Sequence, residues 1–111
     1  MSAAMEEGTY ERLAAVAFRA IGDAFEDVDP EVVDCDAAGD VVTLMVRGQK
    51  CIVNTQRPAR QIWVAANARA WHFSWDPSQE RWMDDKGRGD ELFATLARIV
   101  KEGAGVDVHF P

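Results

Sequence analysis

Seven carboxylates gather in a short stretch of the first third of the chain, and carboxylates bind cations. Asp23, Glu26 and Asp27 have the i, i+3, i+4 spacing that places side chains on one face of a helix. Their mutual repulsion, beside the negative end of a helix dipole, favours a bound cation or a basic partner. Carboxylate oxygens suit Fe³⁺, Ca²⁺, Mg²⁺ and Mn²⁺, and they tolerate Fe²⁺. The predicted metal ligands are Asp23, Glu26, Asp27, Asp29, Glu31, Asp34 and Asp36.

The same acidic stretch has a plainer interpretation as a solvated surface that binds nothing. The spacing of the acids does not separate the two interpretations, so both stay open. If a metal does bind, the lack of a preformed cage implies weak binding, with a dissociation constant on the order of 10⁻⁵–10⁻³ M.

A tryptophan among polar residues marks a second candidate surface. Side chains alternate along a strand, so if Ile62 and Val64 face the interior, Gln61 and Trp63 face away from it. A sheet with helices on one side leaves its other face in solvent, where a tryptophan is a typical interaction hot spot. Alternatively, Trp63 lies flat on its neighbours or beneath the C-terminal tail. The predicted partner-binding residues are Asn54, Arg60, Gln61, Trp63 and His72, the last as a surface residue rather than a metal ligand.

Residue patterns typical of catalysis are missing from the sequence. The chain has no glycine-rich phosphate loop, no HExxH and no CxxC pair. Cys35 and Cys51 stand sixteen residues apart without a neighbouring histidine, so a zinc site or a Cys/His nucleophile has weak support. We therefore predict no catalytic residue.

The acidic stretch should lie at the end of a first helix. Thr9 is a suitable N-cap, and Glu11 suits the first turn, where the helix dipole stabilises an acid. Apolar residues recur with helical spacing through residue 28. Pro30 should end the helix, because the residue before a proline is pushed out of the α region.

Six short strands should follow, at residues 32–36, 41–46, 51–54, 61–65, 70–75 and 81–83. The continuous apolar run at 41–46 predicts a buried strand. Trp75 and Trp82 are most simply core residues. A second helix should begin after Asp90 as its cap and end at Gly103 and Gly105, with the apolar tail lying against the helices.

The order of these elements predicts the fold class. Consecutive strands joined by tight turns form antiparallel pairs. Two helices with one apolar stripe each need a common surface to cover. We therefore expect an α+β fold, a two-layer αβ sandwich with both helices packed on one face of an antiparallel sheet of about six strands.

Length and composition describe an ordinary globular chain. The 111 residues suit one domain, expected to span 1–111, and 48% hydrophobic with 28% charged residues argue against disorder and repeats. No apolar run is long enough for a membrane span, and the N-terminus lacks the features of an export signal. Two cysteines are too few for a disulfide framework. We expect a reduced, cytoplasmic protein without a membrane partner.

The charges divide the chain unevenly. Its net charge is −7, but residues 1–40 carry eleven acids and two bases, whereas residues 41–111 carry eight acids and ten bases. We expect an acidic pole and a basic face, which is a statement about partners rather than about the fold. The acidic balance argues against non-specific nucleic-acid binding.

Residues 52–65, which read IVNTQRPARQIWVA, closely resemble the signature of the frataxin family, roughly I-N-x-Q-x-P-x-x-Q-[IV]-W-[LV]-[AS]. Trp71-His72-Phe73 with Trp82 resemble the next two strands of that family. The acids at 26–36 resemble its acidic ridge, and the similarity spans residues 9–110. The short N-terminus without a transit peptide is similar to the bacterial branch of the family.

This resemblance implies an αβ sandwich and a role in iron–sulfur cluster assembly. The protein would be an iron-binding regulator or iron donor that acts on the cysteine desulfurase and the scaffold protein. Iron, as Fe²⁺ or Fe³⁺, would bind weakly at the surface through Glu26, Asp27, Asp29, Glu31, Asp34 and Asp36. Asn54, Gln61 and Trp63 would contact the assembly machinery, and His72 would be a further surface contact. The protein would be a monomer that metal could drive into oligomers.

The sequence departs from the family pattern at one acidic position, and two other functions are compatible with it. Gly22 stands where bacterial members commonly carry an acid, so one carboxylate is missing and the iron capacity should be lower. A first alternative is a ferroxidase or iron-storage activity on the acidic ridge. A second is a pure interaction module that uses Trp63 and the bases of residues 41–75 toward single-stranded nucleic acid, which the sequence pI of 4.7 disfavours.

Overall fold

Two helices and six strands make up residues 5–110, the part of the chain that this computed structural model describes. Helix α1 spans Glu7–Ala24 and helix α2 spans Leu92–Ala104. The strands are β1 (Val33–Ala38), β2 (Val41–Val46), β3 (Gln49–Gln56), β4 (Gln61–Ala66), β5 (Arg69–Asp76) and β6 (Arg81–Asp84).

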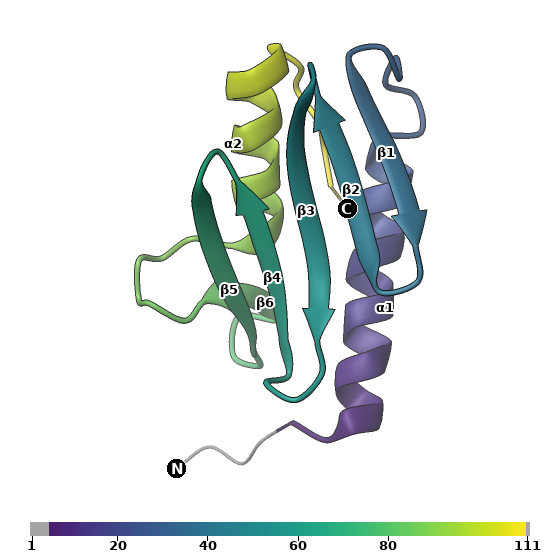
Figure 1. Cartoon of the computed structure of the whole chain (residues 1–111). Coiled ribbons are helices and arrows are strands. Elements are labelled where there is room, and N and C mark those ends of the chain that lie inside the picture. The colour runs from purple at the N-terminus through teal and green to yellow at the C-terminus, as the bar shows by residue number, and fades with distance from the viewer. Residues whose placement is uncertain (1–4, 111) are drawn as a thin grey trace.

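The strands form one antiparallel sheet in chain order, β1-β2-β3-β4-β5-β6. Figure 1 shows both helices on the same side of this sheet. The predicted α+β sandwich of two layers is therefore confirmed. All six predicted strands exist; the largest difference is β3, which extends two residues beyond the predicted 51–54 at each end.

Alternating burial along the strands separates an inner face from an open face. Ile62 and Val64 are buried beneath the helices, whereas Trp63 between them is partly exposed, as predicted. The strand at 41–46, predicted to be buried, is buried on one face only, through Val42, Leu44 and Val46. Val41 is 39% exposed, because the sheet has no second layer of helices to cover that side.

Helix α1 begins earlier and ends earlier than predicted. Its N-cap is Glu6 rather than Thr9, and its last residue is Ala24, well before Pro30. The chain tightens after Gly22, where the backbone N–H of Phe25 donates to the Gly22 carbonyl at 3.3 Å. Two features explain the early end: an acid in the last turn is unfavourable for the helix dipole, and the tight turn buries the Phe25 ring.

Helix α2 is capped by Glu91 and not by Asp90. The Glu91 carboxylate accepts from the backbone N–H groups of Phe93 and Ala94 at 2.9 and 3.0 Å. Gly103, expected to end the helix, lies within it instead. A Cβ there would come within 2.8 Å of a Val46 methyl group, so the close approach of α2 to β2 requires a glycine. The helix ends at Gly105.

Aromatic rings hold the two layers together. Tyr10 of α1 meets Trp82 edge to face at 6.0 Å between ring centroids, and Trp82 meets Trp75 at 5.5 Å. Trp82 is buried as predicted, but Trp75 is only partly buried at the rim of the core. The tail lies against both helices as expected, since Phe110 stacks on Phe93 at 4.9 Å and meets Phe25 at 6.2 Å.

No helix among the described residues is both long enough and apolar enough to cross a membrane. The longer of the two, α1, alternates buried alanines with exposed charged residues. That pattern is typical of a helix with one face on a protein core.

Replacing Ala68 with glycine should stabilise the fold. The β4–β5 turn holds Asn67 and Ala68 at φ of 55° and 61°, whereas the similar β2–β3 turn has Gly48 at its second position, at φ 83°. Left-handed backbone is unfavourable for alanine but not for glycine. We expect Ala68→Gly to raise the free energy of unfolding by about 0.5–1 kcal/mol in urea denaturation. Gly48→Ala is the matched control and should lower it; a loss of stability in Ala68→Gly would contradict this account.

Candidate functional site

The seven predicted metal ligands form an acidic edge of the molecule, and all seven side chains are exposed. Asp23 lies in the last turn of α1. Glu26 and Asp27 follow in turns. The prediction that they share one helix face with Asp23 is therefore wrong. Within residues 5–110 none of the seven forms an ion pair. The remaining members are Asp29 and Glu31 before β1, and Asp34 and Asp36 on it.

Five of the seven acids line two separate shallow hollows, and Glu31 and Asp36 line neither of them. Asp23, Asp27 and Asp29 line a hollow of about 570 Å³ between the end of α1 and the C-terminal tail. Glu26 and Asp34 line another, of about 290 Å³, between the end of α1 and β1. The predicted ligands thus do not converge on one point.

The geometry of the acidic edge is that of a diffuse field rather than a coordination cage. Across the described part of the chain, no three His, Cys, Asp or Glu side chains lie close enough together to hold a metal ion. The Asp29 carboxylate is partly engaged, since it accepts from the backbone N–H of Glu31 at 2.9 Å. Such an arrangement can attract cations and basic surfaces by charge alone.

Two residues of the C-terminal tail lie beside the acidic edge, which the sequence analysis did not predict. Asp107 and His109 line the same hollow as Asp23 and Asp27. Asp107 pairs with Lys101 of α2 at 3.2 Å. Only the return of the tail past α1 brings these residues there, and no local pattern in the sequence indicates it.

The second candidate surface, hereafter the sheet face, is a row of side chains across β3, β4 and β5. Asn54 pairs with Trp63, and Trp63 pairs with His72 in the strand register. The Trp63 and His72 rings stack with centroids 4.1 Å apart and planes 15° from parallel. The tryptophan therefore lies flat on a neighbour, one of the two alternatives considered, and still leaves part of its surface in solvent.

A hydrogen-bond network fixes the Trp63 ring in its plane. Its indole Nε1–H donates to Oε1 of Gln61 at 2.8 Å. The Gln61 amide nitrogen in turn donates to Oγ of Ser74 at 3.0 Å and to Oδ2 of Asp85 at 2.9 Å. Oδ2 of Asp85 also lies 3.8 Å from Nδ1 of His72. Sequence analysis missed Asp85, because it belongs to the loop after β6 and reaches the sheet face only in the folded chain.

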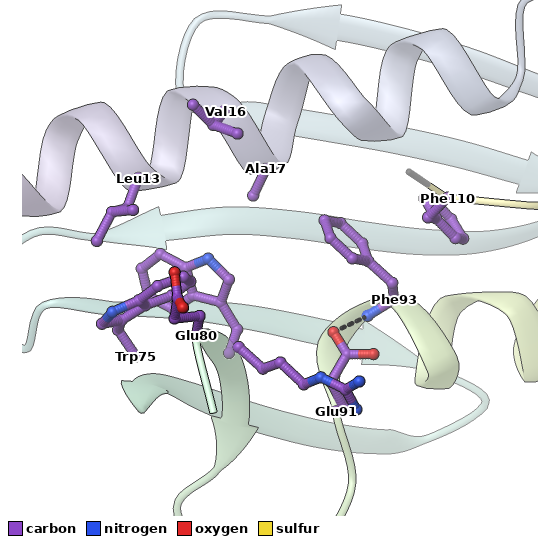
Figure 2. A pocket seen from close by; sticks show the side chains of 10 residues that line it. Leu13, Val16, Ala17, Trp75, Glu80, Glu91, Phe93 and Phe110 are labelled. Carbon is purple, nitrogen blue, oxygen red and sulfur yellow. Dashed lines mark hydrogen bonds between the residues drawn. The ribbon is translucent and has the colours of Figure 1, made fainter. Parts of the chain in front are cut away.

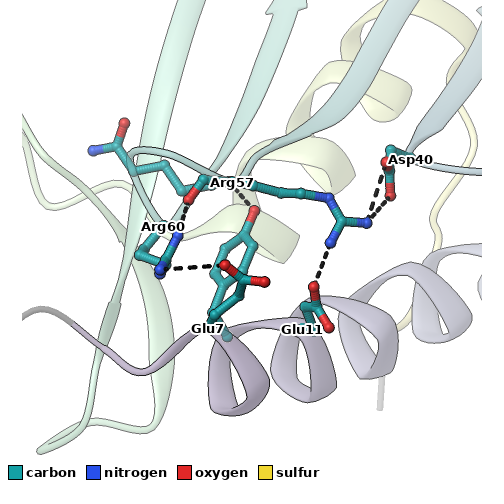
Figure 3. Close-up of polar contacts among 7 residues, drawn as sticks. Glu7, Glu11, Asp40, Arg57 and Arg60 are labelled. Carbon is teal, nitrogen blue, oxygen red and sulfur yellow. Dashed lines mark hydrogen bonds and ion pairs between the residues drawn. The ribbon is translucent and has the colours of Figure 1, made fainter.

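Arg60 does not belong to the sheet face, contrary to its predicted place beside Trp63. It lies in the β3–β4 turn, and Nε donates to the Met5 carbonyl at 3.2 Å, next to Glu7 at 3.7 Å (Figure 3). Arg57 from the same turn bridges Glu11 of α1 and Asp40 of the β1–β2 turn, at 2.5 and 3.0 Å. Both arginines fasten the start of α1 to the turns beneath it.

The two cysteines do not act as ready nucleophiles or metal ligands. Burial raises the pKa of Cys51 to about 12. Partial burial, followed by the charges of Asp34 and Asp36, also raises the pKa of Cys35. Since the thiolate is the reactive form, both thiols stay protonated at neutral pH.

A hollow of about 380 Å³ opens between α1, β6 and the start of α2 (Figure 2). Leu13, Val16, Trp75 and Phe93 are among the apolar residues that line it. The Glu91 carboxylate beside it is occupied as the α2 cap. Among the described residues that line it there is no histidine, cysteine or serine, so it offers no thiol or serine nucleophile and no imidazole base.

The loop that carries Asp85 is held by an ion pair between a buried aspartate and a partly exposed arginine. The Asp84 side chain is fully buried, and the Arg88 guanidinium donates to both of its oxygens at 2.9 and 3.1 Å. This hydrogen bonding from Arg88 lowers the pKa of Asp84. The loop also closes at its ends, where the backbone N–H of Asp84 donates to the Asp90 carbonyl at 2.9 Å.

Comparison with known proteins matches this chain to one family. The model of the Frataxin-like domain matches residues 3–106. The iron-sulfur cluster assembly protein CyaY of Pseudomonas aeruginosa is 36% identical over 108 residues, which are 96% of this chain and 98% of that protein. CyaY of Azotobacter vinelandii is 36% identical over 91 residues, 82% of each chain.

Solved structures share the fold. A frataxin from Psychromonas ingrahamii, of the CyaY family, superposes with a TM-score of 0.85 at 27% identity and covers 96% of this chain and 99% of that one. A trimeric frataxin from Saccharomyces cerevisiae, complexed with ferrous ion, superposes with a TM-score of 0.67 at 20% identity, covering 96% and 92%. The second similarity speaks for the fold alone.

Asp84→Asn should destabilise the protein in a pH-dependent way. The pKa of Asp84 is lowered in the folded state, so its contribution is complete above the unfolded value of about 4 and disappears as the pH falls through the folded value. We expect the variant to lose about 1–2 kcal/mol of unfolding free energy at pH 7 and the difference to shrink in acid. Urea denaturation at pH 7 and pH 3 measures this, with exposed Glu102→Gln as control. A constant difference would refute the assignment.

Proposed function

This chain belongs to the frataxin-like family, and on that premise we propose that it takes part in iron–sulfur cluster assembly as an iron-binding regulator of the cysteine desulfurase–scaffold complex. The curated relatives of similar length carry the name iron-sulfur cluster assembly protein. The observation that carries the proposal is that Asp34 and Asp36 of the acidic edge share the uncovered side of the sheet with the residues of the sheet face.

Strand register supports this arrangement of the two surfaces. Asp36 of β1 lies opposite Thr43, and Thr43 lies opposite Ile52, so all three share the open face. Trp63 of β4 is on the same face, three strands from β1, which is about 14 Å at the usual strand spacing. One partner that covers the open face would meet both the aromatic row and part of the acidic edge.

Iron is the cargo that fits the acidic edge best in this context. Hard oxygen ligands without a preformed cage bind Fe²⁺ or Fe³⁺ weakly and reversibly, which suits a protein that senses or hands on the ion. The field of the acidic edge also suits a basic surface of the desulfurase. Iron binding would then compete with docking, because both neutralise the same carboxylates.

The regulator is favoured over the ferroxidase alternative by the same geometry. Oxidation of iron with turnover requires the ion to be held at a fixed point where oxygen reaches it. Five of the seven predicted metal ligands spread over two hollows, and the thiols stay protonated. A diffuse binding surface is the better description.

Iron should bind at the acidic edge, and a carboxylate added at Gly22 should strengthen that binding. Gly22 lines the hollow of Glu26 and Asp34, and a Cβ there meets no atom within 4 Å. In an anaerobic amide NMR titration, Fe²⁺ should broaden residues 23–36, with Ca²⁺ as the diamagnetic comparison. We expect Gly22→Glu to tighten binding about two- to threefold over Gly22→Gln at low salt, and the gain to fade as salt rises.

The neutral Gly22→Gln variant controls for the new side chain and for the loss of glycine from the helix. Broadening centred on His72 or Cys51 would mean a discrete site elsewhere and would contradict the acidic edge as the iron surface. No broadening with Fe²⁺ would remove iron from the proposal.

Docking on the desulfurase–scaffold complex should depend on both surfaces. Asp27→Lys combined with Asp29→Lys should weaken binding to the desulfurase at least about tenfold at low salt, because like charges would then face each other. Trp63→Ala should weaken binding to the complex by a similar factor that changes little with salt. Surface plasmon resonance at two ionic strengths measures both, with Glu102→Lys on α2 as the matched control. Undiminished binding in either variant would eliminate that surface.

A further inference from the structure

Four side chains on the sheet face form a closed circuit. Trp63 donates to Gln61, Gln61 donates to Asp85, Asp85 lies beside His72, and His72 stacks on Trp63. Three of the four residues belong to strands, and only Asp85 comes from a loop. Each ring or amide in the circuit is thereby held by two neighbours.

Asp85 and the Trp63 indole N–H together fix which way the Gln61 amide points. An ionised carboxylate can only accept hydrogen bonds, whereas the Ser74 hydroxyl can both donate and accept. Only Asp85 therefore requires the Gln61 nitrogen on its side, which leaves the Gln61 oxygen for the Trp63 indole N–H. The indole N–H only donates and favours the same orientation, so without the carboxylate it alone would hold the amide, and less firmly.

The backbone holds Asp85 where it can do this. Its N–H donates to the His72 carbonyl at 2.9 Å, which continues the strand row Asn54–Trp63–His72 by one residue. The neighbouring Asp84 is anchored by Arg88. The carboxylate of Asp85 is 31% exposed and the imidazole of His72 34%, so both lie at the border of the surface that a partner would cover.

We propose that Asp85 is a positioning residue of the sheet face: through Gln61 it holds Trp63 and His72 in one orientation before the partner arrives. A side chain that is already ordered loses less conformational entropy on binding, which raises affinity without a new contact. The inference rests on the proposed function for its partner, the desulfurase–scaffold complex. The positioning itself is a property of the free protein.

The free protein provides the first test. The Trp63 indole N–H resonance, assigned with Trp63→Phe, reports its hydrogen bond to Gln61. We expect Asp85→Asn to move this resonance and speed its exchange with water, because asparagine can offer either oxygen or NH₂ to Gln61. Asp85→Glu keeps an acceptor-only group and should restore most of the signal. Glu102→Gln, a matched loss of one charge on α2, should leave it unchanged.

Affinity for the desulfurase–scaffold complex provides the second test. We expect Asp85→Asn and Asp85→Ala to weaken binding roughly 3- to 10-fold, and Asp85→Glu to recover most of it. An unchanged indole resonance in Asp85→Asn overturns the inference, even if affinity falls, since Asp85 would then touch the partner directly. A shifted resonance with unchanged affinity overturns it as well.

These outcomes separate the inference from the proposed function. If the wild-type protein does not bind the complex, or if Trp63→Ala binds as well as wild type, the docking role of the sheet face fails. The indole measurement on the free protein still decides whether Asp85 orients Gln61 and Trp63. Only a shifted resonance together with weaker binding supports both.

Discussion

The burial of one face of the sheet under two helices is the constraint on which the rest of the structure depends. Because side chains alternate along each strand, every residue placed in the core puts its neighbours on the open side. Ile62 and Val64 are fully buried, so Gln61 and Trp63 have to face solvent. A shift of one residue in register would bury the amide and the indole N–H away from their present partners, at a cost of several kcal/mol. Core and binding surface therefore follow from the same register.

Polar contacts rather than burial give the sheet face its order. Trp63 lies between a stacked imidazole and an amide acceptor, and the amide is oriented from a neighbouring loop. That loop is itself closed by the buried Asp84 and its arginine. The surface most suited to binding is thus tied to a part of the core. A flexible aromatic surface would lose more entropy on meeting a partner.

The acidic edge lowers the stability of the isolated fold, which points to a role in binding. Helix α1 ends with an acid and without a base in its last turn, where the helix dipole favours the opposite. The carboxylates that follow carry no ion pair in the described part of the chain. Like charges this close in the chain repel one another. Residues that lower stability without a structural return are typical of functional surfaces, and binding a cation or a basic protein would relieve the repulsion.

Much of this protein could be predicted from its sequence, because the relevant signals are local. Alternation placed Ile62 inside and Trp63 outside, helical spacing located both helices, and the motif at 52–65 indicated the family. Side-chain period and turn chemistry depend on neighbours in the chain, so they are visible before folding. Even the acidic character of residues 23–36 is a local property.

Only the tertiary structure determined the contacts between segments that are far apart in the chain. Asp85 reaches Gln61, Asp107 and His109 reach the hollow of Asp23, and Arg60 turns to the start of α1 rather than to Trp63. The division of the acids between two hollows is of the same kind, because it depends on where α1 stops and where the tail returns. Such contacts arise from the packing of elements that are far apart in the chain, and no periodicity in the sequence records them.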